Sequence, residues 1–102
     1  MSTYRLGPKG TSDLAEIFDY TVDTWGEQQA ENYVEELARC FQLLANLPGL
    51  GRACDLIFRG IRRFELGKHV IFYKPDRDGI IVSRILHQRM LPARPQFMDS
   101  SL

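Results

Sequence analysis

The sequence predicts a single α+β domain in which a pair of helices packs on an antiparallel sheet. Residues 8–47 carry apolar side chains at helical spacing, with a break at Gly26. After Pro48 and Gly49 the spacing of the apolar residues falls close to two, which is typical of strands. A chain of 102 residues is large enough for one modest core, so residues 1–102 are expected to form one domain.

The first half of the chain begins with a short strand and continues as a helical hairpin. The alternating segment "TYRLG" predicts a first or edge strand. A helix should start between Pro8 and Asp13, because proline suits a first turn and Asp13 with Glu16 forms a candidate capping pair. Its expected inward face is Leu14, Ile17, Phe18, Thr21, Val22 and Trp25.

The second helix should run from about Glu27 to Leu47, where Pro48 and Gly49 end it. Its expected inward residues are Ala30, Tyr33, Val34, Leu37, Ala38, Phe41, Leu44 and Ala45. Because a single glycine joins the two helices, they should lie antiparallel.

Three consecutive strands are expected to follow as an antiparallel meander. They are "IFRGIRRFEL" with Gly60 as a bulge or twist point, then "KHVIFYK", then "IIVSRILH". The pair Asp78-Gly79 favours a hairpin turn between the last two. The segment from about residue 91 contains two prolines and is expected to be an irregular tail.

Both faces of the middle strand are apolar. His69, Ile71 and Tyr73 should share one face, and Val70 and Phe72 the other. Helices can cover only one face of this sheet, so we expect the second face to be exposed and available to a partner.

Composition excludes several classes of protein. The formal net charge is zero, which argues against a surface that binds nucleic acid all round. No apolar run approaches the roughly 20 residues of a membrane span, and the N-terminus lacks the apolar core of a signal peptide, so a cytoplasmic protein is expected. Cys40 and Cys54 are expected to be reduced thiols, and no metal or cofactor site is predicted.

Charge is unevenly distributed along the chain. Residues 1–48 hold 3 basic and 8 acidic residues, a balance of 3 − 8 = −5. Residues 49–102 hold 10 basic and 5 acidic residues, a balance of 10 − 5 = +5. The second half therefore suits an anionic partner, although acidic helices could equally well offset basic strands within the fold.

The predicted strands carry two sets of residues that could form a site. Arg59, Arg62, Arg63 and Arg84 could capture anions or could simply face solvent, and the neighbours Arg62 and Arg63 should point to opposite faces. His87 could act as a general acid or base with Glu65 and an arginine, the minimum set for RNA cleavage. The catalytic patterns GxSxG, HExxH and the P-loop are absent from the sequence.

Three pieces in their order and spacing make the chain similar to a known family. They are "DLAEIFDYTVDTWGEQQAENYVEEL", then "LPGLGR", then "FRGIRRFELGKHVIFYKPDRDGIIVSRILHQRM". Together they resemble the RelE/ParE superfamily of bacterial toxins, and the residues match the ParE branch best.

The resemblance implies the toxin of a type II toxin–antitoxin pair, cytoplasmic, with a role in growth regulation and plasmid stabilisation. Its partner would be a ParD-like antitoxin with a ribbon-helix-helix DNA-binding half and a tail that folds over the toxin. DNA would be contacted only through the antitoxin, and the cellular target would be DNA gyrase. Relatives on the RelE branch cleave messenger RNA on the ribosome, but this chain has no tyrosine after His87 and no excess of positive charge.

We therefore expect function by binding rather than by catalysis. The antitoxin tail is expected to be acidic and amphipathic, and to be held by Arg59, Arg62, Arg63, Tyr73, Arg84 and Arg89. His87 would end its strand with a hydrogen bond. The alternative nuclease site would consist of Glu65, Arg84 and His87.

Overall fold

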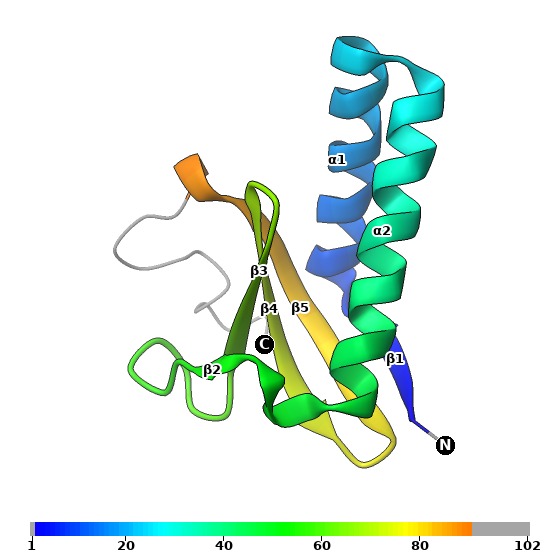
Figure 1. The fold of residues 1–102 in the computed structure, drawn as a ribbon. Helices are drawn as coiled ribbons and strands as arrows, with labels where there is room; N and C mark the ends of the chain where they lie inside the picture. Colours follow the sequence, from blue (N-terminus) through cyan, green and yellow to red (C-terminus); the bar gives the residue numbers. More distant parts are fainter. Residues whose placement is uncertain (1, 91–102) are drawn as a thin grey trace.

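The computed structural model describes residues 2–90 and confirms the α+β class (Figure 1). The elements in chain order are β1 (Thr3–Leu6), α1 (Pro8–Trp25), α2 (Glu27–Asn46), the 3₁₀ turn η1 (Pro48–Leu50), β2 (Arg52–Ala53), β3 (Arg62–Leu66), β4 (His69–Asp76), β5 (Gly79–His87) and the 3₁₀ turn η2 (Gln88–Met90). The predicted irregular tail lies outside the described residues.

The five strands form one sheet in the order β1-β5-β4-β3-β2. The predicted meander is confirmed as β3, β4 and β5, which pair antiparallel. β1 joins the far side of β5 in parallel, with Thr3 opposite Gly79 and Leu6 opposite Val82. Gly79 has a φ of 152°, and a Cβ there would collide with the Thr3 carbonyl oxygen. Glycine at this position therefore lets β1 approach the sheet.

The helical hairpin is confirmed, with two corrections. α1 begins at Pro8 as a first-turn proline, and α2 follows after Gly26. Asp13 and Glu16 do not cap α1, because both lie within the helix. Trp25 is 70% exposed rather than inward-facing. It is the last residue of α1, at the end of the hairpin that extends beyond the sheet (Figure 1).

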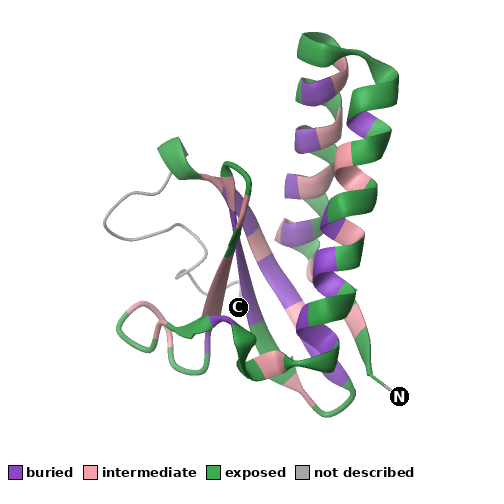
Figure 2. Cartoon of the chain, viewed as in Figure 1, coloured by how far each residue is buried: buried purple, intermediate pink, exposed green. Residues whose placement is uncertain are grey.

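The main core lies between the helices and one face of the sheet (Figure 2). It contains the fully buried Leu37, Phe41 and Leu44 of α2 and the buried Ile71 and Tyr73 of β4, with further residues from α1 and β5. β1 adds Tyr4, whose ring lies 5.3 Å from that of Phe41. Part of this arrangement was predicted, since Ile71 and Tyr73 share one face of the sheet as expected, and the structure shows that this face packs against the helices.

The second face of the sheet is covered, which corrects the expectation of an exposed apolar face. Val70 and Phe72 are fully buried there in a cluster with Ile61 and Leu86. Cys54, Ile57 and Phe58, from the segment between β2 and β3, pack against this cluster. The face therefore has a small core of its own.

That segment also corrects the predicted start of the first meander strand. Residues 57–60 form turns and a bend, and β3 starts only at Arg62. Gly60 is not a bulge but a turn residue with a φ of 84°, a conformation that favours glycine. The register shift in the sheet lies instead between Phe72 and Tyr73, where β4 pairs with β5.

No helix in the described part of the chain is long and apolar enough to cross a membrane.

Candidate functional site

Arg84 is bound within the fold. Its Nε and Nη2 donate to the two carboxylate oxygens of Asp13 in α1, at 2.7 and 3.0 Å. The same carboxylate accepts the backbone N–H of Ile85 at 2.9 Å. The Arg84 side chain is 15% exposed, and its hydrogen bonds to Asp13 raise its pKa against the opposing effect of burial. The expectation that Arg84 captures a carboxylate of a partner is therefore corrected, since its guanidinium already forms a bidentate ion pair with the internal carboxylate of Asp13.

Asp13 is placed where the edge of β5 would otherwise be open. β1 ends at Leu6, opposite Val82. The next part of β5 faces α1, and Asp13 there accepts a backbone hydrogen that no strand takes. A buried N–H without an acceptor is unfavourable, so this carboxylate completes the edge of the sheet.

Tyr73 and Arg62 hold the turn before β2 against the sheet. The Tyr73 hydroxyl accepts the N–H of Gly51 and donates to the carbonyl of Pro48, both at 2.8 Å. Arg62 donates from Nε to the carbonyl of Gly51 at 2.9 Å and from Nη2 to that of Gly49 at 3.2 Å. Tyr73 is fully buried, so its predicted contact with an antitoxin is corrected to a structural role.

Arg63 lies on the opposite face from Arg62, as predicted, because they are consecutive strand residues. It is paired across the strands with Arg52 of β2. Both guanidinium groups bind the same oxygen of Glu65, at 3.1 Å from Arg52 and 3.2 Å from Arg63. Arg63 also stacks over the Phe72 ring at 5.8 Å, and its Nε is buried without a hydrogen-bond acceptor in the described structure. Two cations thus share one carboxylate.

Arg59 and Arg89 are exposed. Within residues 2–90 neither side chain forms an ion pair or hydrogen bond. Arg59 lies in the loop between β2 and β3, whereas Arg89 lies in η2 at the other end of the sheet (Figure 1). The structure therefore does not bring the six predicted residues together. Arg59 and Arg63 lie with Arg52 at the end of the sheet that carries β2, whereas Arg89 lies in η2 at the other end.

The residues of the alternative nuclease site are also separated. Glu65 is in register with Val70 and Leu86 on the second face of the sheet. His87 is in register with His69 and Leu66, one position further along each strand, and hence on the helix-facing side. Arg84 is held by Asp13. The prediction that His87 ends its strand is confirmed: β5 ends at His87, and its Nδ1 accepts the N–H of Arg89 at 3.0 Å.

His69 links the sheet to α2. Its Nδ1 lies 2.6 Å from the Tyr33 hydroxyl, and its ring meets that of His87 edge-on at 5.3 Å. Burial, and then the neighbouring His87, lower the pKa of His69. Burial is also the main cause that raises the pKa of Tyr33 to about 12. The neutral forms of both side chains are thus favoured in the folded protein.

The lowered pKa of His69 predicts how stability depends on pH. The unfolded chain takes up the proton at higher pH than the folded chain, so the free energy of unfolding should fall as pH drops below the ordinary histidine value of about 6.5. Urea denaturation between about pH 7.5 and 5.5, above the ordinary carboxyl range, should show this decline. His69→Asn should flatten the curve. An equally steep decline in that variant would contradict the assignment.

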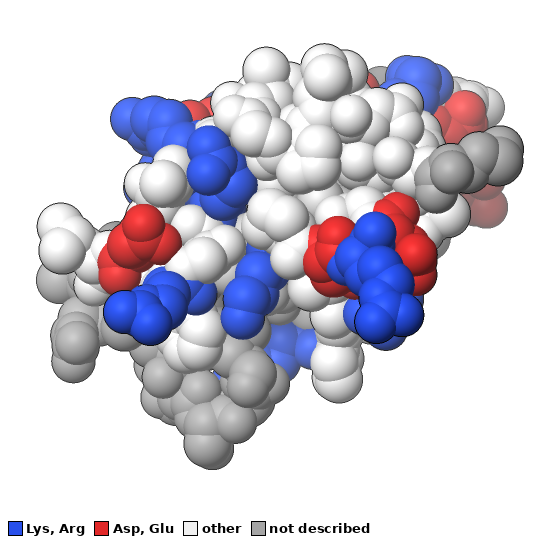
Figure 3. Space-filling model, turned by 90° about the horizontal axis from the view of Figure 1, so that it is seen from below, with Lys and Arg blue, Asp and Glu red and all other residues white. Residues whose placement is uncertain are grey.

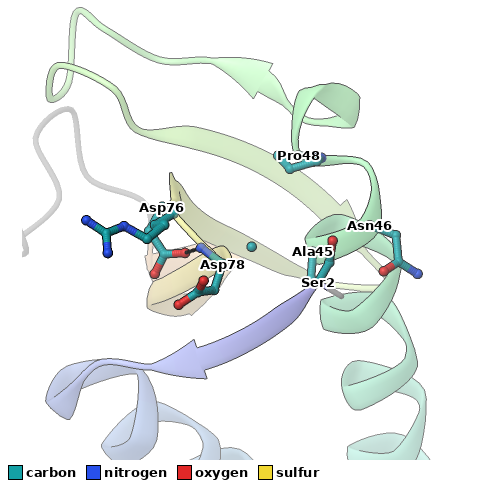
Figure 4. Close-up of a pocket in the computed structure, with 8 residues that line it drawn as sticks. Ser2, Ala45, Asn46, Pro48, Asp76 and Asp78 are labelled. Atoms are coloured by element: carbon teal, nitrogen blue, oxygen red, sulfur yellow. Dashed lines mark hydrogen bonds between the residues drawn. The ribbon is translucent and has the colours of Figure 1, made fainter.

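A separate hollow of about 360 Å³ lies between the end of α2 and the β4–β5 turn (Figure 4). Its lining comes from Ser2, residues 45–46, Pro48 and residues 76–79. Asp76 is paired with Arg5 at 3.0 Å and accepts the N–H of Asp78, and the hydrogen bond from Arg5 is the main cause that lowers its pKa. Across residues 2–90, no three or more His, Cys, Asp or Glu side chains form a group that could hold a metal ion.

Basic side chains gather at the end of the molecule that carries β2. Seen from below, Lys and Arg are spread over the side of the loop after β2, with few carboxylates between them (Figure 3). A mixed group of both signs lies on the opposite side of that view. Sequence reasoning missed Arg52 here. The two-residue strand β2 carries too short a pattern to be read, and its register with Arg63 appears only in the folded sheet.

Comparisons with known proteins agree with this fold. Residues 4–92 match the family model described as ParE toxin of type II toxin-antitoxin system, parDE. A Toxin ParE1 of Mycobacterium tuberculosis is 46% identical over 90 residues, covering 87% of this chain and 92% of that protein. A Toxin ParE1 of Caulobacter vibrioides is 38% identical over 92 residues, covering 88% and 93%. A solved structure described as the chromosomal ParDE TA system from P. aeruginosa has a TM-score of 0.70 at 22% identity, covering 85% of this chain and 96% of that one, and supports the fold.

The fold and the relatives place the chain among the toxins of type II toxin–antitoxin systems. Within that class it belongs to the ParE toxin family, because the family model spans most of the chain. The resemblance read from the sequence is thereby confirmed, and the ParE branch is supported over the RelE branch.

Proposed function

We propose that this ParE toxin is held inactive in the cytoplasm by a ParD-like antitoxin and that it inhibits growth by binding DNA gyrase. The antitoxin would carry a ribbon-helix-helix half, through which alone the complex would contact DNA, and an acidic amphipathic tail. The toxin would act by binding and not by catalysis.

The observation that carries the antitoxin contact is the excess of positive charge around Glu65. Arg52 and Arg63 share this one carboxylate, and Arg63 keeps a buried Nε without an acceptor in the described structure. An additional carboxylate at this edge could pair with the largely exposed guanidinium of Arg52, so that Glu65 would no longer have to balance two cations. Arg59 extends the basic surface along the adjoining loop. The name of the similar P. aeruginosa structure, a ParDE system, supports a ParD-like partner.

The separation of Glu65 from His87 supports a non-catalytic toxin. A general base and a general acid must both reach the reacting group, and these two residues lie on opposite faces of the sheet. A ribosome-dependent nuclease, the alternative from sequence, would need another set of residues.

Gyrase and messenger RNA assays test this proposal directly. The purified chain should inhibit supercoiling by gyrase, and an equimolar amount of the antitoxin encoded beside it should restore supercoiling. His87→Ala should inhibit as well as the wild type, and primer extension on cellular messages should show no new ends.

A variant that removes two positive charges from the basic surface around Glu65 links this assay to that surface. Arg52→Gln with Arg63→Gln should still inhibit gyrase but should need roughly tenfold more antitoxin for relief, because two cations of the basic surface are lost. Arg77→Gln, an exposed arginine in the β4–β5 turn, is the control. Message cleavage that disappears in His87→Ala would refute the non-catalytic proposal. Unchanged supercoiling with the wild-type chain would refute gyrase as the target.

A further inference from the structure

The loop between β2 and β3 is fixed by its own hydrogen bonds. Five such bonds close it: Cys54 N–H to Ile61 O at 2.9 Å, Ile57 N–H to Cys54 O at 2.8 Å, Phe58 N–H to Cys54 O at 3.1 Å, Ile61 N–H to Phe58 O at 3.1 Å, and Gly60 N–H to the Asp55 carboxylate at 2.8 Å. On its inner side, Cys54, Ile57 and Phe58 pack on the second core cluster. The loop therefore has a defined conformation in the free toxin, without a partner.

This fixed loop presents one leucine wholly to solvent. Leu56 has a relative exposure of 101%, higher than that of any other large apolar residue in the described structure. Its neighbours Ile57 and Phe58 are partly buried, so the loop turns a single apolar side chain outward. Because the backbone that carries Leu56 is already fixed, binding here needs no ordering of the loop, which favours affinity.

The charges around Leu56 define the partner. From Arg52 to Arg63 the chain holds four arginines and one acid, a balance of 4 − 1 = +3. The acid, Asp55, is turned to the N–H of Gly60 within the loop. Lys74 adds a further cation, 5.6 Å from the Phe58 ring. Arg59 has no ion-pair partner within residues 2–90. The surroundings thus match an acidic segment that also carries apolar side chains.

The surface around the two strongly exposed aromatic side chains, Tyr20 and Trp25, does not suit such an acidic segment. Tyr20 and Trp25 lie on α1 near the end of the hairpin. The stretch from Glu16 to Glu36 around them holds seven acidic and no basic residues. An acidic partner would be repelled there and attracted at Leu56.

We propose that the loop from Cys54 to Ile61 is a preformed anchor for the acidic amphipathic tail of the antitoxin. Leu56 packs between apolar side chains of the tail, and Arg59 pairs with one of its carboxylates. This inference rests on the proposed antitoxin partner and adds an apolar anchor to the basic surface described above.

The test is the affinity of the full-length antitoxin encoded beside this chain, measured by calorimetry against purified toxin variants. Leu56→Ser should weaken binding roughly tenfold or more, as for an interface anchor. It should leave the melting temperature unchanged, because the side chain touches solvent alone. Leu47→Ser, at a leucine that is 54% exposed at the end of α2, is the matched control and should bind as the wild type does. Arg59→Gln, on the same loop, should also weaken binding. If Leu56→Ser alters the melting temperature, the affinity of Arg59→Gln tests the inference instead.

A second pair of variants tests the fixed conformation. Asp55→Ala removes the acceptor for Gly60 and should weaken binding roughly threefold, since a looser loop must be ordered on binding. Asp55→Asn keeps an oxygen in place and should bind at least as tightly as the wild type. A purely charge-based effect would make the two variants equal.

Three outcomes would overturn the inference, and they differ in what they leave standing. Equal affinities of the wild type, Leu56→Ser and Arg59→Gln would overturn this inference and leave the antitoxin in place. A wild-type chain that binds no antitoxin would overturn the inference and the proposed partner together. Loss of self-association alone in Leu56→Ser, seen by sedimentation, would assign the loop to a second copy of the chain and would also overturn the inference.

Discussion

Asp13→Ala should lower the free energy of unfolding by about 3–5 kcal/mol, as expected when a buried ion pair loses one member. The change leaves the guanidinium of Arg84 without its carboxylate, and both side chains are largely buried, at 15% and 9% exposure. It also leaves the N–H of Ile85 without an acceptor at the edge of β5. Because small domains have only about 5–15 kcal/mol of stability, the variant should be close to unfolding at growth temperature. Urea denaturation monitored by circular dichroism measures the change.

Two further variants make this result specific. Asp19→Ala, at an exposed carboxylate of the same helix, should change stability by less than about 0.5 kcal/mol. Combining Asp13→Ala with Arg84→Met should recover part of the loss, because the uncompensated cation is gone while the N–H of Ile85 stays unsatisfied. A single Asp13→Ala variant as stable as the wild type would show that the pair contributes nothing.

Tyr73→Phe should lower the free energy of unfolding by about 2–4 kcal/mol, because it leaves one buried and one part-buried polar group unpaired at about 1–3 kcal/mol each. The phenolic hydroxyl is the acceptor for the N–H of Gly51 and the donor to the carbonyl of Pro48. Tyr73 is fully buried, so antitoxin affinity at a temperature where the variant is folded should not change. Thermal unfolding and calorimetry on the same preparation measure the two effects.

Tyr20→Phe is the matched control, since its hydroxyl belongs to an exposed residue on α1. It should leave both stability and affinity unchanged. The opposite pattern for Tyr73→Phe, full stability with weakened antitoxin binding, would return Tyr73 to the contact surface that the sequence suggested.

Most of the architecture could be predicted from the sequence because it depends on local patterns. Gly26 separates two runs of helical spacing, and the end of α2 just before Pro48 follows from residue types alone. The alternation in β4 correctly assigned Ile71 and Tyr73 to one face of the sheet and Val70 and Phe72 to the other. These features require no knowledge of distant residues.

Errors arose where a distant partner decides the outcome. Asp13 reads as a helix cap, but its partner Arg84 lies 71 positions away. Residues 57–61 are apolar enough to read as strand, yet they cover the second face of the sheet as a loop. That loop is why the face expected to be exposed is buried.

The candidate site was predicted only in part, because arginines look alike in a sequence and differ by their neighbours. Arg62 and Arg63 are adjacent, yet Arg62 holds carbonyls of the turn while Arg63 shares Glu65 with Arg52 on the other face. The role of Arg59 as an antitoxin contact stays a prediction, and so does that of Arg89. Leu56 could have been noticed only as an apolar residue in a basic stretch, and its exposure depends on the loop conformation.

The parallel pairing of β1 with β5 has a consequence for synthesis. Thr3 and Asp78, which meet at the start of this pairing, are separated by 75 positions. On a ribosome the first strand must wait unpaired until nearly the whole domain has been translated, and α1 lacks its buried cation for as long. The helical hairpin can form early from local contacts, whereas closure of the sheet is the last event. A nascent chain that stops short of β5 therefore lacks both the strand that pairs with β1 and the cation that pairs with Asp13. Premature termination should yield fragments with an incomplete core rather than a shortened toxin.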